Sequence, residues 1–206
     1  MGILKKLTFI VLVLIVGGKG ISQNQEELVS AFTSSYKAES DGDYTKATDV
    51  LKKVFNKDSY EINLRLGWLS YKAGLLDDSE SYYRRATQLM PYSIEARFGL
   101  VYPLSSMGQW DQVIQVYKEI LNIDPQNSVA NYRFGLVYYG REEYGKADKY
   151  FTKVVNLYPF DYDGLHLLAW TKLRLGKTQD AKALFNKALL NRPRDASSLE
   201  GLSLIK

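Results

Sequence analysis

Apolar, small and proline positions recur along this chain with a period of 34 residues. The period is marked by Pro91, Pro125, Pro159 and Pro193. The residue eight places before each proline is aromatic: Tyr83, Tyr117, Phe151 and Phe185. The residues five and twelve places before it are small or aliphatic: Ala86, Ile120, Val154 and Ala188, and Ser79, Val113, Ala147 and Ala181. Residues spaced by three and four lie on one face of a helix, so the pattern predicts an amphipathic helix before each proline.

A second recurring position predicts a turn ahead of each of these helices. Seventeen residues before the prolines stand Gly74, Gly108, Glu142 and Gly176. Glycine there suits the left-handed turn that ends a preceding helix, and the proline then ends the second one. Each unit is therefore expected to be a pair of helices.

A 34-residue helical pair with this pattern resembles the tetratricopeptide repeat (TPR) family. The segments most like the family are "LGWLSYKAG" at 66–74, "FGLVYYG" at 134–140 and "YGKADKYFTKVVNLYP" at 144–159, and "DYTKATDVLKKV" at 43–54 fits the second helix of an earlier unit. The resemblance implies an all-α, right-handed superhelical solenoid of stacked antiparallel helix pairs. We predict about five repeats, the first divergent and within 23–59, the others at 60–93, 94–127, 128–161 and 162–195, and a capping helix at 196–206.

The hexapeptide "RFGLVY" occurs at 97–102 and again at 133–138, which is 36 residues apart rather than 34. The two-residue difference predicts a shortened loop leading into the third repeat and a lengthened first helix or turn within it. Pro103 lies where the difference is absorbed, so we expect a kink or an early end of that helix, with "SSMG" as a longer turn. Both a functional hinge and a feature without function fit this proline.

The first 22 residues have the features of an export signal. Lys5 and Lys6 precede an apolar run from Leu7 to Val16, and small residues follow at Gly20 and Ser22. We expect a cleaved signal peptide and a location in the bacterial periplasm or cell envelope; the alternative is a retained membrane anchor, although a spanning helix needs about 20 apolar residues.

Charge and cysteine content narrow the function classes. Without Lys5, Lys6 and Lys19, the 27 basic residues fall to 24, against 23 acidic ones, so no concentrated basic surface for nucleic acid is expected. The absence of cysteine excludes disulfides and thiolate metal sites. No phosphate-binding glycine loop, nucleophile elbow or metal-ligand spacing is present, and His166 is the only histidine. We therefore expect no catalytic residue, no metal and no cofactor.

The resemblance implies that the first helix of each repeat lines an inner groove. In the family register, aromatic side chains and a histidine face this groove: Phe32, Tyr36, Trp68, Tyr71, Tyr132, Tyr139, His166 and Trp170. In the third repeat, either Leu100 and Pro103 or Phe98 and Tyr102 face inward, depending on the shift. The alternative is that many of these rings belong to the core, since tyrosine tolerates half-burial.

Arginines stand two residues before a glycine in three successive repeats: Arg65, Arg97 and Arg133. A ladder of guanidinium groups beside the groove would bind carboxylates of an extended acidic peptide or a free C-terminus. The alternative is that they cap neighbouring carbonyls. The carboxylate clamp of some family members is absent, because its companion positions hold Leu64, Trp68, Tyr132 and Leu136.

Together these features predict a non-enzymatic, exported scaffold that holds an extended segment or helix of an envelope protein. Membrane association would then come through the partner or an uncleaved N-terminus. Two alternatives stay open: a polysaccharide-binding or polysaccharide-secretion scaffold, and a structural protein that self-associates through its C-terminal segment.

Overall fold

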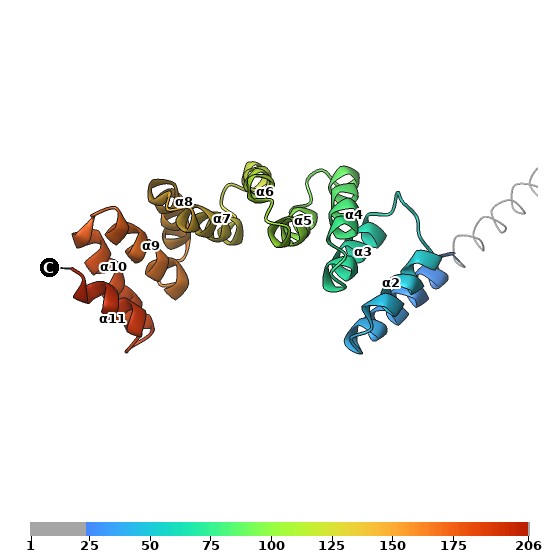
Figure 1. Cartoon of the computed structure of the whole chain (residues 1–206), viewed down its shortest axis with the longest axis horizontal. Coiled ribbons are helices and arrows are strands. Elements are labelled where there is room, and N and C mark those ends of the chain that lie inside the picture. The colour runs from blue at the N-terminus through green and yellow to red at the C-terminus, as the bar shows by residue number, and fades with distance from the viewer. Residues whose placement is uncertain (1–23, 206) are drawn as a thin grey trace, which may run out of the picture. The chain divides into compact units, whose positions relative to one another are not determined.

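The structure is a computed structural model that describes residues 24–205, and all regular secondary structure in that range is helical (Figure 1). Residues 24–40 are helical. They are followed by α2 (Tyr44–Lys53), α3 (Tyr60–Lys72), α4 (Leu76–Leu89), α5 (Ile94–Ser106), α6 (Trp110–Ile123), α7 (Ser128–Gly140), α8 (Tyr144–Leu157), α9 (Tyr162–Arg174), α10 (Thr178–Asn191) and α11 (Ala196–Ser203). The chain divides into two compact units, the first ending at Gly108 and the second beginning at Gln109.

The first helix of each pair begins at a side-chain cap. Ser59 accepts a hydrogen bond from the backbone N–H of Ile62, and the equivalent residues Ser93, Asn127, Asp161 and Asp195 cap α5, α7, α9 and α11 in the same way. A side-chain oxygen here satisfies a backbone donor that the helix leaves unpaired. The second helices α4, α6, α8 and α10 have no side-chain cap.

The turns between the paired helices confirm the predicted left-handed conformation. Gly74, Gly108 and Gly176 have φ of 77°, 71° and 72°. Glu142 takes the same place with φ of 60°, although a residue with a Cβ adopts it at some cost. The turn geometry is thus kept where glycine is missing.

The aromatic residue of each second helix lies in the core of its helical pair. Tyr83 of α4, Phe151 of α8 and Phe185 of α10 are buried, together with Ala86, Val154 and Ala188 one turn further along. Within the units, α3 packs on α4, α4 on α5, α7 on α8, α8 on α9 and α9 on α10. Each helix therefore hides its apolar face against its chain neighbours, as repeats do.

The third repeat corrects one prediction. α5 spans 13 residues, as α3, α7 and α9 do, and it begins three residues after Pro91, just as α7 begins three residues after Pro125. The two hexapeptides therefore lie in different registers, Arg97 being the fourth residue of α5 and Arg133 the sixth of α7. The predicted shortened loop and lengthened helix are wrong, because the caps Ser93 and Asn127, not the hexapeptides, fix where the helices start.

Pro103 lies inside α5, which continues for three more residues. The early end predicted for this helix is wrong, since a proline so near the C-terminus removes one backbone bond while the amide of Met107 still bonds to the carbonyl of Pro103. The kink stays a prediction.

The C-terminal helix α11 packs on the last helical pair. Leu202 and Ile205 contact the cluster of Ala169, Ala181 and Phe185. The predicted signal peptide lies outside the described residues. Within residues 24–205, no helix has the length and apolar character that a membrane span requires.

Candidate functional site

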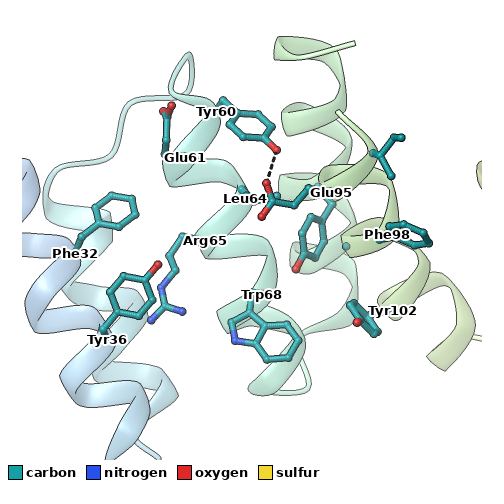
Figure 2. A pocket seen from close by; sticks show the side chains of 13 residues that line it. Phe32, Tyr36, Tyr60, Glu61, Leu64, Arg65, Trp68, Glu95, Phe98 and Tyr102 are labelled. Atoms are coloured by element: carbon teal, nitrogen blue, oxygen red, sulfur yellow. Dashed lines mark hydrogen bonds between the residues drawn. The ribbon is translucent and has the colours of Figure 1, made fainter. Parts of the chain in front are cut away.

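The first unit contains a groove of about 810 Å³, lined by 13 residues, seven of them aromatic (Figure 2). α3 and α5 contribute the same five helix positions, namely the first, second, fifth, sixth and ninth. These residues are Tyr60, Glu61, Leu64, Arg65 and Trp68 from α3, and Ile94, Glu95, Phe98, Gly99 and Tyr102 from α5. Phe32 and Tyr36 add a wall from the helix at 24–40, and Tyr83 comes from α4.

Tyr83 lies beneath the groove because Gly99 has no side chain. A Cβ on Gly99 would lie 2.0 Å from Cε1 of the Tyr83 ring, which no packed structure allows. The ring is only 3% exposed, and burial raises the pKa of its hydroxyl well above the usual value. One aromatic side chain thus belongs to both the core and the groove.

Three rings form a continuous aromatic surface at one end of the groove. Tyr102 lies 5.9 Å from Trp68 and 5.2 Å from Tyr71 between ring centroids, and Trp68 lies 6.0 Å from Tyr71. Distances of this size are typical of favourable tilted aromatic pairs. The surface is suited to contact with apolar or planar groups.

A polar network lies beside this surface. Trp68 donates its indole N–H to Oε1 of Glu39 at 2.5 Å, and Nη1 of Arg65 pairs with Oε2 of the same carboxylate at 2.5 Å. The Arg65 guanidinium stacks over the Tyr36 ring at 3.9 Å. Burial raises the pKa of Glu39, but the hydrogen bonds from Trp68 and Arg65 outweigh it, and the pKa is lowered. The Arg65 charge is thus neutralised within the protein.

The opposite end of the groove is acidic. The Tyr60 hydroxyl hydrogen-bonds to Ser93 at 2.7 Å and donates to Glu95 at 3.2 Å. Ser59 donates to Glu61 at 3.0 Å. Burial is the main reason why the pKa of Tyr60 is raised, and the negative charge of Glu95 raises it as well. Glu61 and Glu95 are both exposed.

Of the residues predicted for the first unit, the groove contains Phe32, Tyr36, Arg65 and Trp68. Tyr71 belongs to the adjoining aromatic surface. In the third repeat the alternative with Phe98 and Tyr102 is the one that lines the groove. Arg97 donates from Nη1 to the carbonyl of Ser93 at 3.0 Å, which is the capping role weighed for the arginines. Arg97 is the fourth residue of its helix and Arg65 and Arg133 are the sixth of theirs, so the predicted ladder does not use one position.

Sequence reasoning missed the acidic side of the groove. Glu61 and Glu95 share the second position of their helices, 34 residues apart, and this spacing was visible in the sequence. They are first-turn acids of the kind that stabilise any helix start, so their type alone does not indicate that they line a groove. The contact of Glu39 with Trp68 crosses between helices and had no local signal.

In the second unit, Tyr132 and Arg133 line a separate cleft of about 470 Å³ with Tyr158, Asp161 and Asp163. Burial first, and then the two aspartates, raises the pKa of Tyr132. Tyr139 lies away from this cleft, its ring edge-on to Tyr144 at 5.3 Å.

His166 and Trp170 form a closed polar network with the last helix. Nε2 of His166 lies 2.9 Å from Oγ of Ser197, and Trp170 donates its indole N–H towards both Ser197 at 3.1 Å and His166 at 3.2 Å. The His166 ring stacks on Tyr162 at 5.3 Å. Burial lowers the pKa of His166. Within residues 24–205, no group of three histidine, aspartate or glutamate side chains is placed to hold a metal ion.

Comparison with known proteins identifies the repeats. Two family models described as tetratricopeptide repeat match residues 129–161 and 166–205. The TPR repeat-containing protein YpiA of Bacillus subtilis (strain 168) is 25% identical over 173 residues, which are 83% of this chain and 40% of YpiA. The TPR repeat-containing protein MJ1428 of Methanocaldococcus jannaschii is 25% identical over 202 residues, 90% of this chain and 34% of that protein. The chain thus spans less than half the length of these relatives.

Solved structures show the same fold. A crystal structure of MamA protein aligns with a TM-score of 0.71 and 22% identity, covering 84% of this chain and 95% of MamA. A tetratricopeptide repeat protein from Parabacteroides merdae aligns with a TM-score of 0.74 and 21% identity, covering 86% and 72%. YrrB, described as a TPR protein with an unusual peptide-binding site, aligns with a TM-score of 0.70 and 14% identity, covering 91% and 97%.

Proposed function

Because the chain is a member of the tetratricopeptide repeat family, we propose that it is a non-enzymatic adaptor that binds a segment of a partner protein. The binding site is the groove between α3 and α5. The observation that carries this proposal is the groove itself, an open space of about 810 Å³ walled by aromatic side chains from neighbouring helices. Concave, mostly apolar surfaces with a few polar groups are the usual form of binding sites.

Two further points support the proposal. YrrB, which shares the fold, is described as having a peptide-binding site. The apolar run from Leu7 to Val16 after Lys5 and Lys6 has the composition of an export signal, and on this ground we place the adaptor in a bacterial cell envelope. There it would hold an envelope complex together.

A photo-crosslinking experiment tests the groove directly. A photoreactive phenylalanine analogue replaces Tyr102 in the full chain, which is then irradiated in an extract of the source cells. The same analogue at Gln88, an exposed position on α4, is the control. The crosslinked segment is identified by mass spectrometry, synthesised and titrated against the wild-type chain.

We expect one protein segment to crosslink from Tyr102 and not from Gln88. Binding of the synthetic segment should fall at least about tenfold in a Trp68→Ala/Tyr102→Ala variant that circular dichroism shows to be folded, because aromatic anchors carry much of the energy of such contacts. Equal crosslinking from both positions contradicts the proposal. A change in tryptophan fluorescence with oligosaccharides but with no peptide would favour a polysaccharide ligand instead.

A further inference from the structure

The charges that line the groove do not cancel. Three of the lining residues carry charge: Glu61, Glu95 and Arg65. Arg65 is already paired with Glu39, which lies beside the groove. Neither Glu61 nor Glu95 forms an ion pair with a cation among residues 24–205. The groove therefore has an excess of negative charge, at the end where α3 begins.

Both carboxylates belong to residues that line the groove. Each is the second residue of its helix, and both helices line the groove (Figure 2). The Tyr60 hydroxyl bonds to Glu95 at 3.2 Å, which orients that carboxylate beside the groove. Trp68 and Tyr102 lie at the other end of the same view. A ligand that spans the groove meets a negative end and an aromatic end.

The aromatic faces of the groove attract positive charge, as its carboxylates do. The π face of a tryptophan or tyrosine carries partial negative charge and attracts ammonium and guanidinium groups. Lysine and arginine also have long apolar stems, which pack on rings while the charged end reaches a carboxylate. An acidic segment, in contrast, would be repelled by Glu61 and Glu95.

Arg65 provides an independent sign of a ligand. Its side chain is 8% exposed, and its Nε and Nη2 groups are buried without a hydrogen-bond acceptor. Unpaired buried donors are costly. Because Glu39 already balances the charge, a neutral acceptor such as a peptide carbonyl suits these donors better than a carboxylate does. The Tyr36 ring covers the guanidinium and is itself 55% exposed, and we expect this ring to move when the carbonyl binds.

From these observations we infer that the partner segment is a basic and apolar peptide. A lysine or arginine of the segment lies between Glu61 and Glu95, its apolar side chains lie on Trp68, Phe98 and Tyr102, and a main-chain carbonyl accepts from Arg65. This inference rests on the proposed function, since it names the chemistry of the ligand of the same groove. It replaces the acidic peptide that the arginine pattern predicted.

Selection from a phage-displayed library of random peptides tests the inference. The immobilised full chain is the bait, and a Trp68→Ala/Tyr102→Ala variant removes peptides that bind elsewhere. The most enriched peptide is synthesised and its affinity measured by fluorescence anisotropy with the wild type and with Glu61→Gln/Glu95→Gln. The matched control is Asp77→Asn/Asp78→Asn, which neutralises two first-turn acids of α4 outside the groove.

We expect lysine and arginine to be enriched over aspartate and glutamate in the selected peptides. Glu61→Gln/Glu95→Gln should weaken binding about fivefold to tenfold, since two partly exposed ion pairs are removed, and the control should change it less than about twofold. Added salt should weaken binding to the wild type more than to Glu61→Gln/Glu95→Gln.

Two other outcomes separate the possible failures. Peptides that need Trp68 and Tyr102 but show no preference for basic residues, or that bind equally to Glu61→Gln/Glu95→Gln, overturn the inference and leave the proposed function standing. A selection in which no peptide depends on Trp68 and Tyr102 overturns both.

Discussion

Trp68 and Trp170 hold the same position, the ninth residue of α3 and of α9, but their indole N–H groups are used in opposite directions along the chain. Trp68 donates back to Glu39, which precedes it by 29 residues, whereas Trp170 donates forward to Ser197, which follows it by 27. In the first unit, the Trp68 N–H thus points away from α5, and the groove lies between α3 and α5. In the second unit, His166 and Trp170 are tied to α11.

The difference shows that an aromatic inner helix does not by itself make a binding site. The two faces differ in the second residue of α11 and of α5, the first helices that come one repeat later. In α11 this residue is Ser197, whose short hydroxyl meets both rings, and in α5 it is Glu95, which bonds to Tyr60 instead. In the second unit, hydrogen bonds tie the two rings of α9 to the next helix α11, whereas in the first unit the Trp68 indole bonds to Glu39 and not to α5.

Loss of the Phe185 ring should disrupt the packing of α11 most strongly. Phe185 is fully buried, lies edge-on to Trp170 at 5.3 Å and fills the space left by Gly201 of α11. We expect Phe185→Ala to lower the free energy of unfolding by about 3–5 kcal/mol, as large cavities do. Chemical denaturation gives the stability, and hydrogen exchange should show α11 losing protection. Lost stability with α11 still fully protected would contradict the role of Phe185 in holding this helix.

The stability of the groove in the first unit depends on a charge instead. Glu39→Gln keeps an acceptor for Trp68 but leaves the buried guanidinium of Arg65 without its counter-charge. We expect a loss of about 2 kcal/mol, because an unpaired buried charge is strongly unfavourable. The control is Glu80→Gln, which removes the more exposed ion pair with Arg84 one helical turn away and should cost less than about 0.5 kcal/mol. Equal losses in urea unfolding would show that the Glu39 pair is no more than a surface interaction.

Ser197→Ala should release the two rings of α9 from α11 at small cost. The substitution removes the hydroxyl that hydrogen-bonds to both His166 and Trp170, and we expect a loss of about 1 kcal/mol. In a Trp68→Phe/Trp110→Phe background, the emission of Trp170 should shift to longer wavelength as its indole becomes hydrated. Ser203→Ala, an exposed serine of the same helix, should leave the emission unchanged. Identical spectra for both variants would refute the closed network.

The smallest effect is a dependence of stability on pH. Burial lowers the pKa of His166 below its value in the unfolded chain, and the positive charge of Arg192 lowers it further. The negative charges of Asp195 and Asp163 raise it but do not outweigh these effects. The neutral ring is thus favoured in the folded state. Its contribution to stability is complete above the unfolded pKa of about 6.5 and is lost as the pH falls below that value and through the lower pKa of the folded chain. Protonation of Nε2 would also place a donor against the Trp170 indole.

We expect the melting temperature to fall by about 1–3 °C between pH 7.5 and pH 5.5, and His166→Gln to remove this fall. His166 is the only histidine, and carboxylates with lowered pKa, such as Asp195 and Glu39, lose their contribution at lower pH. The window therefore isolates His166. The same slope in His166→Gln would assign the effect to another group.

The sequence predicted the repeat architecture because the signals for it are local and periodic. Pro91 and its equivalents, the glycines with positive φ and the aromatic residue eight places before each proline all act within one helical pair. The hexapeptide gives the wrong register for the third repeat because the cap at Ser93, and not the repeated sequence, sets the start of α5.

The site was less predictable, for a different physical reason. Trp68 could be assigned to a groove from its helix position, but whether its indole would bond to Glu39 or to the next helix depends on how three helices pack together. Arg65 looked available for a ligand, yet Glu39, 26 residues earlier, neutralises it. Contacts of this kind arise from side-chain geometry and have no periodic pattern in the sequence.

The absence of a side chain at Gly99 means that the groove and the core share one ring. A ligand that contacts Tyr83 through this opening would touch α4, a helix that contributes no other residue to the groove lining. Occupancy of the groove should therefore slow amide exchange in α4 as well as in α3 and α5. Binding in the groove would then reach α4 through a single tyrosine.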